Sequence, residues 1–502
     1  MKSFLTFDVG TTAMKCVLFD ESFNKTAFVS REYSLLTPAP DIVEIDPQVY
    51  WDTFVFCVKE IAKQVGEENM KRIAALTFTT QGETLIPVDT DLKAIRNAIV
   101  WIDARADKQG EAIKKAMPLK TFYARTGLSC VNGALPLAKL MWIKENEPEI
   151  YNRTYKFLLL EDYLIARLTG QTVSEKSLLS STGWFDINEE AYLNDLLTAC
   201  GIDKAKLPDI LPCGQTVAHV SEEAAAETGL FTSTVVTTGA MDQVSSAVGA
   251  GNVEEGIVTE TTGTALVIGA TSSHADYDNP EMLTIYKHFD HGFLYMPFCN
   301  TAGIVLKWFK DNFLEELTAK AEQEGKSVYG LVDEYAEQAA PGSNGVILLP
   351  HFAGKGVPNE IENACGVLYG LTLATKKSDV TRAVLEGVGY MLHEVLLSLE
   401  KAGVPVSEVR SLGGGSYSRL WGQIKADICQ KTFIRMNEAE STSLGAAILG
   451  YCAVTDGADV KTVASNQAGK KASFSPNGKN QVLYAASYSK YLSLYEALKQ
   501  EF

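Results

Sequence analysis

The apolar residues of this chain fall into short runs bounded by turn residues, and into longer stretches where they recur every three or four positions. Residues 4–9 form such a run around Asp8, and Gly10-Thr11-Thr12 separates it from a second run at 14–19. Short apolar runs on either side of a Gly-Thr turn are typical of two buried strands joined as a hairpin.

The same arrangement returns halfway along the chain. Residues 259–262 lead into Gly263 and Thr264, and an apolar run follows at 265–268. Glycine lets the backbone approach an anion closely, and the N–H and hydroxyl groups that follow it point at oxygens. Two copies of this turn predict a duplicated lobe that holds a polyphosphate between the two hairpins.

Strand and helix patterns alternate around the hairpins. Asp46 and Pro47 are typical of a helix start, and the helix that they open is predicted to end near Gly66. The period of the apolar positions predicts further helices over 305–313 and 379–401, and strands over 73–79, 84–88, 98–101, 345–349 and 409–412. This alternation predicts an α/β fold. The aromatic segment after Asn480 is predicted to be a packing helix.

At 502 residues the chain is too long for a single hydrophobic core. The run Gly249-Ala250-Gly251-Asn252 is the preferred boundary between two domains, which are predicted over 1–250 and 251–455. Residues 456–502 are predicted to form an extension that packs on the second lobe.

Composition and charge narrow the choice of partners. The chain is 46% hydrophobic and 21% charged, as is usual for a globular protein, and its net charge of −17 disfavours nucleic acid or an anionic membrane. No apolar run is long enough to cross a bilayer, and no signal-peptide layout is present, so we expect no export. Nine cysteines without a Cys-x-x-Cys pair favour reduced thiols and a cytoplasmic location.

Common nucleotide motifs are absent. The chain has neither a G-x-x-x-x-G-K-[ST] loop nor a strand-linked G-x-G-x-x-G, so neither a Walker site nor a dinucleotide fold is predicted. Asp242 instead follows the apolar residues 235–238 at a strand-to-helix turn. The positive end of the helix is expected to keep Asp242 ionised and ready to accept a proton. A plain helix N-cap is the other interpretation of Asp242.

Two long, irregular motifs add a family resemblance. One consists of Gly366-Val367-Leu368-Tyr369-Gly370-Leu371, Asp379-Val380 and Ala383-Val384-Leu385-Glu386, and the other of Pro136, Lys139-Leu140, Trp142-Ile143 and Glu145-Asn146. Together with Trp101-Ile102-Asp103-Ala104-Arg105 and Glu161-Asp162-Tyr163, they resemble the FGGY family of carbohydrate kinases over roughly residues 2–451. The N-terminal signature departs from the family pattern at Ala134.

The resemblance implies two ribonuclease-H-like lobes of the actin and hexokinase type, with ATP in the cleft between them. It places Asp242 on the general base, Gln243 beside it on the sugar, and Asp8 on a magnesium ion held through water. The residues that it places around ATP are Thr11, Thr12, Lys15, Thr264, Gly303, Lys307, Gly414, Gly415 and Arg419. Phosphoryl transfer depends on positioning and charge neutralisation, which Mg²⁺, a lysine and backbone donors provide.

The sugar is less clearly marked. Gln81-Gly82-Glu83 has the glutamate of the glycerol-kinase branch without its arginine, and Ala134 lacks that branch's aromatic ring, so a pocket larger than glycerol requires is expected. Glu83 can accept hydrogen bonds from two hydroxyls, which suits a polyol or ketose better than a sugar acid. Trp101 either offers a flat apolar wall or packs in the core. Gln81 and Asp103 are also assigned to the sugar site.

These features favour a small neutral sugar, with a ketopentose such as D-xylulose as the best candidate. Hexuloses, erythritol-type polyols, L-ribulose and glycerol stay open. An actin-like ATPase without a sugar would share the lobes but lack the FGGY signatures, and an oxidoreductase would need a dinucleotide fingerprint. A homodimer is compatible with the sequence.

Overall fold

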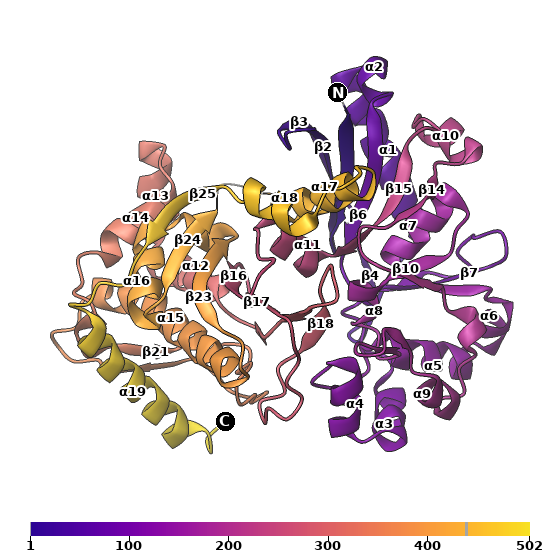
Figure 1. The fold of residues 1–502 in the computed structure, drawn as a ribbon. Coiled ribbons are helices and arrows are strands. Elements are labelled where there is room, and N and C mark those ends of the chain that lie inside the picture. The colour runs from indigo at the N-terminus through magenta and orange to yellow at the C-terminus, as the bar shows by residue number, and fades with distance from the viewer. Residues whose placement is uncertain (1, 437–439) are drawn as a thin grey trace.

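The computed structural model describes residues 2–436 and 440–502, which form two lobes (Figure 1). The first predicted hairpin consists of β1 (Ser3–Val9) and β2 (Ala13–Asp20), which pair antiparallel. The second consists of β16 (Gly256–Thr262) and β17 (Leu266–Ser272), also antiparallel. The two hairpins belong to different lobes, so the duplicated arrangement is confirmed.

Each hairpin lies inside a larger sheet, and the two sheets share one strand order. The first sheet runs β14-β15-β6-β1-β2-β3, and β1 pairs parallel with β6, which pairs parallel with β15. The second sheet runs β18-β19-β17-β16-β23-β24-β25, and β16 pairs parallel with β23, which pairs parallel with β24. This is the predicted α/β fold of two ribonuclease-H-like lobes.

The remaining strands of the first sheet are β3 (Lys25–Glu32), β6 (Ile73–Thr80), β14 (Thr216–His219) and β15 (Val235–Met241). Those of the second are β18 (Ile285–Lys287), β19 (Phe293–Tyr295), β20 (Phe298–Cys299), β23 (Val406–Leu412), β24 (Thr432–Met436) and β25 (Lys470–Phe474). A third sheet on the first lobe consists of β4 (Leu36–Ala39), β5 (Ile42–Ile45), β7 (Leu85–Val88), β8 (Ala98–Ile99) and β9 (Lys156–Leu159). Short pairs are formed by β10 (Val173–Glu175) with β13 (Asp209–Leu211), β11 (Phe185–Asp186) with β12 (Ala191–Tyr192), and β21 (Ile347–Leu349) with β22 (Val367–Tyr369).

The predicted helices form with small changes at their ends. At the start of α1, the Asp46 side chain accepts a hydrogen bond from Gln48 N, as an N-cap does. The helices of the first lobe are α1 (Pro47–Val65), α2 (Glu67–Met70), α3 (Asp107–Ala116), α4 (Leu119–Thr126), α5 (Pro136–Asn146), α6 (Pro148–Arg153), α7 (Leu160–Thr169), α8 (Lys176–Leu179), α9 (Asn194–Ala199), α10 (Glu222–Thr228) and α11 (Asp242–Gly249). The second half contains α12 (Gly303–Phe313), α13 (Glu315–Glu324), α14 (Val328–Ala336), α15 (Lys377–Lys401), α16 (Arg419–Cys429), α17 (Ser441–Ala453), α18 (Val460–Gln467) and α19 (Gln481–Leu498).

Helix α17 lies on the opposite lobe from the strands that precede it. It packs against α11 and against β1, β6 and β15 of the first sheet (Figure 1). In the predicted extension, α18 contacts α17 and α11, whereas β25 pairs with β24 and α19 packs on α16 and β21. The extension is therefore shared between the two lobes, and the predicted domain boundaries stay a prediction.

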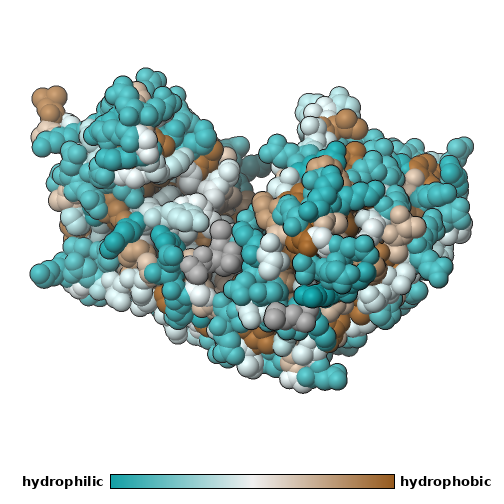
Figure 2. All heavy atoms as spheres, turned by 90° about the horizontal axis from the view of Figure 1, so that it is seen from above, coloured by the Kyte–Doolittle hydropathy of each residue, from teal (hydrophilic) through white to brown (hydrophobic). Residues whose placement is uncertain are grey.

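The second lobe also reaches the first through the segment around β18. Ile285 N–H donates to Gly127 O at 2.9 Å, and Lys287 Nζ lies 3.1 Å from Glu190 of the first lobe. Seen from above, the surface dips between the two lobes (Figure 2). Within residues 2–436 and 440–502, no helix combines the length and the apolarity needed to cross a membrane.

Candidate active site

The first hairpin places a carboxylate beside a cation. Asp8 and Lys15 are opposite each other in the β1–β2 register. Lys15 Nζ lies 4.0 Å from the Asp8 carboxylate and 3.2 Å from that of Glu440, which directly precedes α17. Burial raises the pKa of Asp8 to about 6, although Lys15 lowers it. The hairpin thus holds a largely buried acid next to a lysine that can neutralise phosphate charge.

Predicted phosphate and sugar residues meet at Thr11. Its hydroxyl donates to Gln81 Oε1 at 3.0 Å and accepts from Trp101 Nε1 at 2.9 Å. Trp101 lies beyond the end of β8 and keeps 41% of its surface exposed, so its ring is not part of the core. Thr12, at the same turn, is exposed. The contact of Trp101 with a sugar stays a prediction.

Glu83 lies beside a buried lysine that the sequence marked only as part of a motif. Glu83 has the left-handed backbone conformation, with φ of 68°. Burial raises the pKa of the Glu83 carboxyl, and the charge of Lys139 lowers it. Lys139 is fully buried, and its Nζ donates to the carbonyl oxygens of Val100 (2.9 Å) and Trp101 (3.1 Å). Lys139 therefore links the surroundings of Glu83 to the backbone of Trp101.

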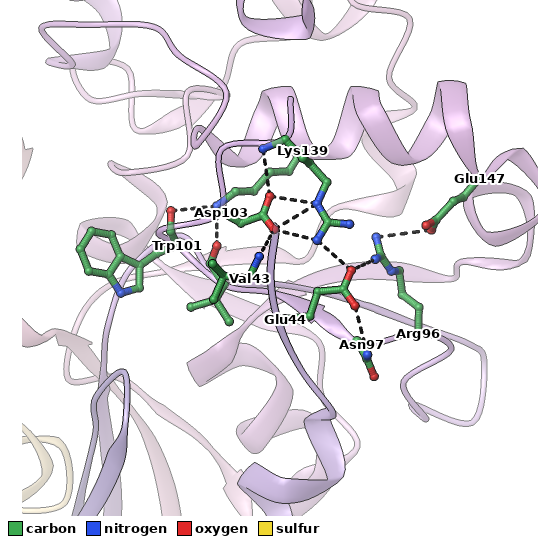
Figure 3. A network of polar contacts seen from close by, with 10 residues as sticks. Val43, Glu44, Arg96, Asn97, Trp101, Asp103, Lys139 and Glu147 are labelled. Atoms are coloured by element: carbon green, nitrogen blue, oxygen red, sulfur yellow. Dashed lines mark hydrogen bonds and ion pairs between the residues drawn. The ribbon is translucent and has the colours of Figure 1, made fainter. Parts of the chain in front are cut away.

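The structure gives Asp103 a different place from the one expected. Its side chain is fully buried, and one carboxylate oxygen accepts from Val43 N at 2.6 Å while Arg105 donates to both oxygens at 2.7–3.1 Å (Figure 3). Arg105 also pairs with Glu44. The protein itself thus satisfies this carboxylate, so Asp103 holds the loop behind Trp101 and does not face an open site.

Asp242 is the first residue of α11 and directly follows β15. Burial raises the pKa of its carboxyl to about 7, the charge of Asp8 raises it further, and hydrogen bonds from Gln243 lower it. Burial therefore outweighs the helix dipole, and the Asp242 carboxyl ionises less readily than the sequence suggested. A carboxyl that titrates near neutral pH is suited to accept a proton from a substrate.

The turn of the second hairpin packs directly against the start of α12. Gly303 N–H donates to Gly263 O at 2.8 Å, and Ala302 N–H donates to Thr264 O at 2.9 Å. A Cβ at Gly303 would lie 2.4 Å from Gly263 O, so only glycine allows this close approach. The start of α12 is therefore held directly against the Gly263 turn, with hairpin carbonyl oxygens as acceptors for its N–H groups.

A cavity of about 660 Å³ opens beside this hairpin. Five of the predicted ATP residues line it, namely Thr264, Gly303, Lys307, Gly414 and Gly415. Arg419 is exposed at the start of α16 and is not among the lining residues. The sequence did not predict the further lining residues Thr262, Ile304, Leu306, Ser327, Tyr329, Gly330, Asp333, Tyr417, Ser418 and Trp421. Those on α14 belong to no motif, and only the fold brings them to the cavity.

A buried ion pair supports the second hairpin from below. Lys425 Nζ lies 2.8 Å from Glu260 and donates to Thr262 Oγ1 at 2.7 Å, and Thr262 donates in turn to Glu260 at 2.7 Å. Lys425 and Glu260 are at most 1% exposed. The network ties α16, on one wall of the cavity, to the turn at Gly263. Sequence reasoning missed it, because these residues are far apart along the chain.

Phosphoryl transfer requires a nucleotide site, a cation near the phosphates and a group that takes the proton of the acceptor. The cavity belongs to the second lobe, whereas the cation Lys15 and the titratable carboxyl of Asp242 belong to the first. This is the arrangement of an ATP-dependent phosphotransferase.

Comparisons with known proteins give the family. The models of the N-terminal and C-terminal domains of the FGGY family of carbohydrate kinases match residues 3–249 and 258–454, and the chain belongs to this family. Gluconokinase of Bacillus subtilis (strain 168) is 30% identical over 450 residues, covering 89% of this chain and 87% of the relative. Xylulose kinase of Staphylococcus xylosus is 28% identical over 443 residues, covering 88% and 89%. The solved structure of xylulose kinase from Lactobacillus acidophilus is similar with a TM-score of 0.90 at 25% identity, over 99% of both chains.

These findings confirm the predicted family, the two-lobed fold and the class of enzyme. The protein is a sugar kinase that uses ATP as phosphate donor. The alternatives of an oxidoreductase and of an actin-like ATPase without a sugar are set aside.

Proposed function

We propose that this kinase phosphorylates a ketopentose, with D-xylulose as the best candidate. The observation that carries the proposal is Glu83, a half-buried carboxyl that lies near Lys139 and two residues beyond Gln81. Its oxygens accept hydrogen bonds, which the hydroxyls of a neutral sugar donate. Xylulose kinases among the relatives and the similar structures support the same choice.

Gluconate is the second candidate, because gluconokinase of Bacillus subtilis is 30% identical to the chain. A gluconate carboxylate beside Glu83 would meet a like charge in a largely buried setting. Such juxtaposition costs several kcal/mol. Lys139 offsets only part of this repulsion, because its charge already acts on Glu83 and lowers the pKa of that carboxyl.

We further propose that Asp242 accepts the proton of the attacking hydroxyl, while Gln243, Gln81 and Trp101 contact the sugar. Thr11, Thr12 and Lys15 face the transferring phosphate from the first hairpin. On the second lobe, the transferring phosphate or the rest of ATP is bound by Thr264, Gly303, Lys307, Gly414 and Gly415. The cavity supports the second group, because all five line it. Arg419 is proposed only for the outer edge of the adenosine site.

Magnesium is the proposed metal, held by Asp8. Mg²⁺ is usually bound by one or two carboxylates together with waters and substrate phosphates. Asp8 supplies one largely buried carboxylate of this kind, and Lys15 beside it would bind phosphate oxygens and not the metal. Across residues 2–436 and 440–502, no group of three acidic, histidine or cysteine side chains could hold a metal alone. Mg²⁺ would neutralise phosphate charge, and Asp8 would fix it through water.

Two assays test the substrate. A coupled ATP-to-ADP assay over pentuloses, hexuloses, pentitols, glycerol and gluconate should give the highest kcat/KM for a ketopentose. Glycerol should be poor, because Gly82 and Ala134 leave space around a three-carbon substrate. The variant Glu83→Gln should lower kcat/KM for D-xylulose. It should raise the ratio of kcat/KM for gluconate to that for D-xylulose by about tenfold or more, because it removes the like charge. Its KM for ATP is the internal control. Higher kcat/KM for gluconate or glycerol than for every ketose would contradict the proposed substrate and leave the kinase class intact.

The cellular setting is part of the proposal. All nine cysteines are free thiols, which suits the reducing cytoplasm. The homodimer stays a prediction.

A further inference from the structure

Two buried side chains hold the main chain just before Asp242. Gly239 N–H donates to Glu161 Oε1 at 2.8 Å, and Met241 N–H donates to Ser177 Oγ at 3.0 Å. Glu161 is 1% exposed and Ser177 is fully buried. The peptide that leads into Asp242 is therefore held on either side of Ala240, by α7 through Glu161 and by α8 through Ser177.

This hold occurs where β15 departs from regular pairing. The register of β15 against β6 shifts between Thr237 and Ala240, so Glu161 is the acceptor for the Gly239 N–H. A Cβ at Gly239 would lie 1.6 Å from Phe78 O, so only glycine fits there. Bulges of this kind bend a strand and re-aim the side chains that follow. The shift therefore sets the direction in which the chain enters α11.

A second layer of polar groups fixes the orientation of Ser177. Its hydroxyl donates to Glu175 Oε1 at 2.8 Å, and Glu175 also accepts from the Cys213 thiol at 2.7 Å. Because the hydroxyl proton is committed to Glu175, an oxygen lone pair of Ser177 is left to accept from Met241. The N–H groups of Ser177 and Leu178 complete the hydrogen bonds to Glu175, at 2.6 and 2.5 Å.

Glu161 has no such layer behind it. Its Oε2 is buried without a hydrogen-bond partner in the described part of the chain. Burial raises the pKa of Glu161 well above its usual range, and the neighbouring Glu175 raises it further. An amide side chain also presents an oxygen at this place, so glutamine can accept the Gly239 N–H as Glu161 does.

We propose that Glu161 and Ser177 are positioning residues for phosphoryl transfer, which fix the backbone of 239–241 so that Asp242 meets the acceptor hydroxyl. The inference rests on the proposed role of Asp242 as proton acceptor. A displacement of about 1 Å can cost about 10²-fold in rate. Neither side chain is proposed to touch the sugar or ATP, so their removal acts on kcat.

The test compares four variants in the full chain. Glu161→Leu leaves the Gly239 N–H unpaired, and Ser177→Ala does the same to Met241. Each should lower kcat by about 10–100-fold, with KM for sugar and ATP changed less than about threefold. Glu161→Gln keeps an oxygen acceptor and should recover most of the lost turnover. Thr234→Val is the matched control, because this fully buried hydroxyl donates to Ile73 O just before β15 begins, away from Asp242. It should cost stability without lowering kcat.

A double-mutant cycle separates this inference from the proposed function. If Glu161 acts through Asp242, adding Glu161→Leu to Asp242→Asn lowers kcat no further than Asp242→Asn alone. Unchanged kcat in folded Glu161→Leu and Ser177→Ala overturns the positioning role, as does equal loss in Thr234→Val. Full activity of Asp242→Asn overturns the proposed base instead. If Glu161→Leu fails to fold, Ser177→Ala decides the question by the same criteria.

Discussion

Asp242 and Asp8 lie close enough for the charge of one to affect the titration of the other, and both are largely buried. Two carboxyls in this setting do not ionise equally readily. Asp8 has Lys15 beside it, whereas the hydrogen bonds to Asp242 come from Gln243. The pair is therefore arranged with Asp8 as the more acidic group and Asp242 as the one that takes up a proton near neutral pH.

The variant Asp242→Asn should fold and bind ATP but lose about 10²–10⁴-fold in kcat, because it removes the proton acceptor. Retention of more than about a tenth of the turnover at saturating substrate would contradict the role.

The variant Asp242→Asn should also be more stable than the wild type at pH 8. The pKa of Asp242 is raised from 3.8 to about 7. The contribution of this group to the free energy of unfolding is therefore fully present below pH 3.8 and is lost as the pH rises through 7. Asparagine cannot ionise, so the variant avoids the cost of a buried charge at pH 8, which is roughly 1–4 kcal/mol. Urea unfolding at pH 5 and pH 8 measures it.

The pH profile of kcat/KM for the sugar should fall on the acid side with a midpoint near pH 7, the pKa of Asp242. Below that value the protonated carboxyl cannot accept the hydroxyl proton. The rate should therefore drop about tenfold for each further pH unit. The residual activity of Asp242→Asn should lack this limb. A flat profile from pH 5 to 8 would contradict the assignment.

At the residue scale, the sequence predicted which positions matter better than it predicted their surroundings. The family pattern marked Asp103, but Arg105 and Val43 occupy its carboxylate in the fold. The family pattern also included Lys139 but gave it no role. The sequence does not show which backbone carbonyls this side chain binds, because their positions depend on the fold. Burial of Asp242 likewise depends on elements from distant parts of the chain.

At the scale of elements, α11 and α17 cross at two glycines. A Cβ on Gly445 would lie 1.8 Å from Ser245 O, and one on Gly249 would lie 1.9 Å from Ser441 O. Helix α11 begins with Asp242, and α17 begins after Glu440, the partner of Lys15. The crossing therefore sets the distance between the proposed base and the first phosphate hairpin.

The variant Gly445→Ala should destabilise the protein by about 1–3 kcal/mol or more, because the backbone of α11 must move to admit the methyl group. It should also lower kcat by displacing Asp242. Gly478→Ala is the matched control, since nothing lies within 4 Å of a Cβ there. Thermal unfolding and steady-state kinetics on both variants measure the two effects. Equal behaviour of the two would show that the crossing is loosely packed.

Local patterns predicted the regular elements well. The helix at Asp46 forms as α1, and the helices expected over 305–313 and 379–401 form as α12 and α15. For the polar segment before Asn480 no helix or strand was predicted, but it contains α18 and β25. These short elements depend on tertiary partners, α17 and β24, and their own sequences carry weak signals.

At the scale of the molecule, the phosphate hairpins lie on separate lobes and both must contact ATP. We therefore expect the lobes to close when sugar and nucleotide bind together. Solution scattering should show a smaller radius of gyration with D-xylulose and a non-hydrolysable ATP analogue than with either alone. An unchanged radius, with binding shown by calorimetry, would contradict closure.

The position of α17 has a consequence for how the protein is made. Phe4, Val17 and Ala75 of the first sheet share one buried cluster with Leu444, Ala447 and Ile448 of α17. Chains emerge from the ribosome N-terminus first, and domains generally fold as units. The first lobe cannot complete its core until residue 453 has been translated, so the part of this sheet face that α17 covers stays exposed while the second lobe is synthesised.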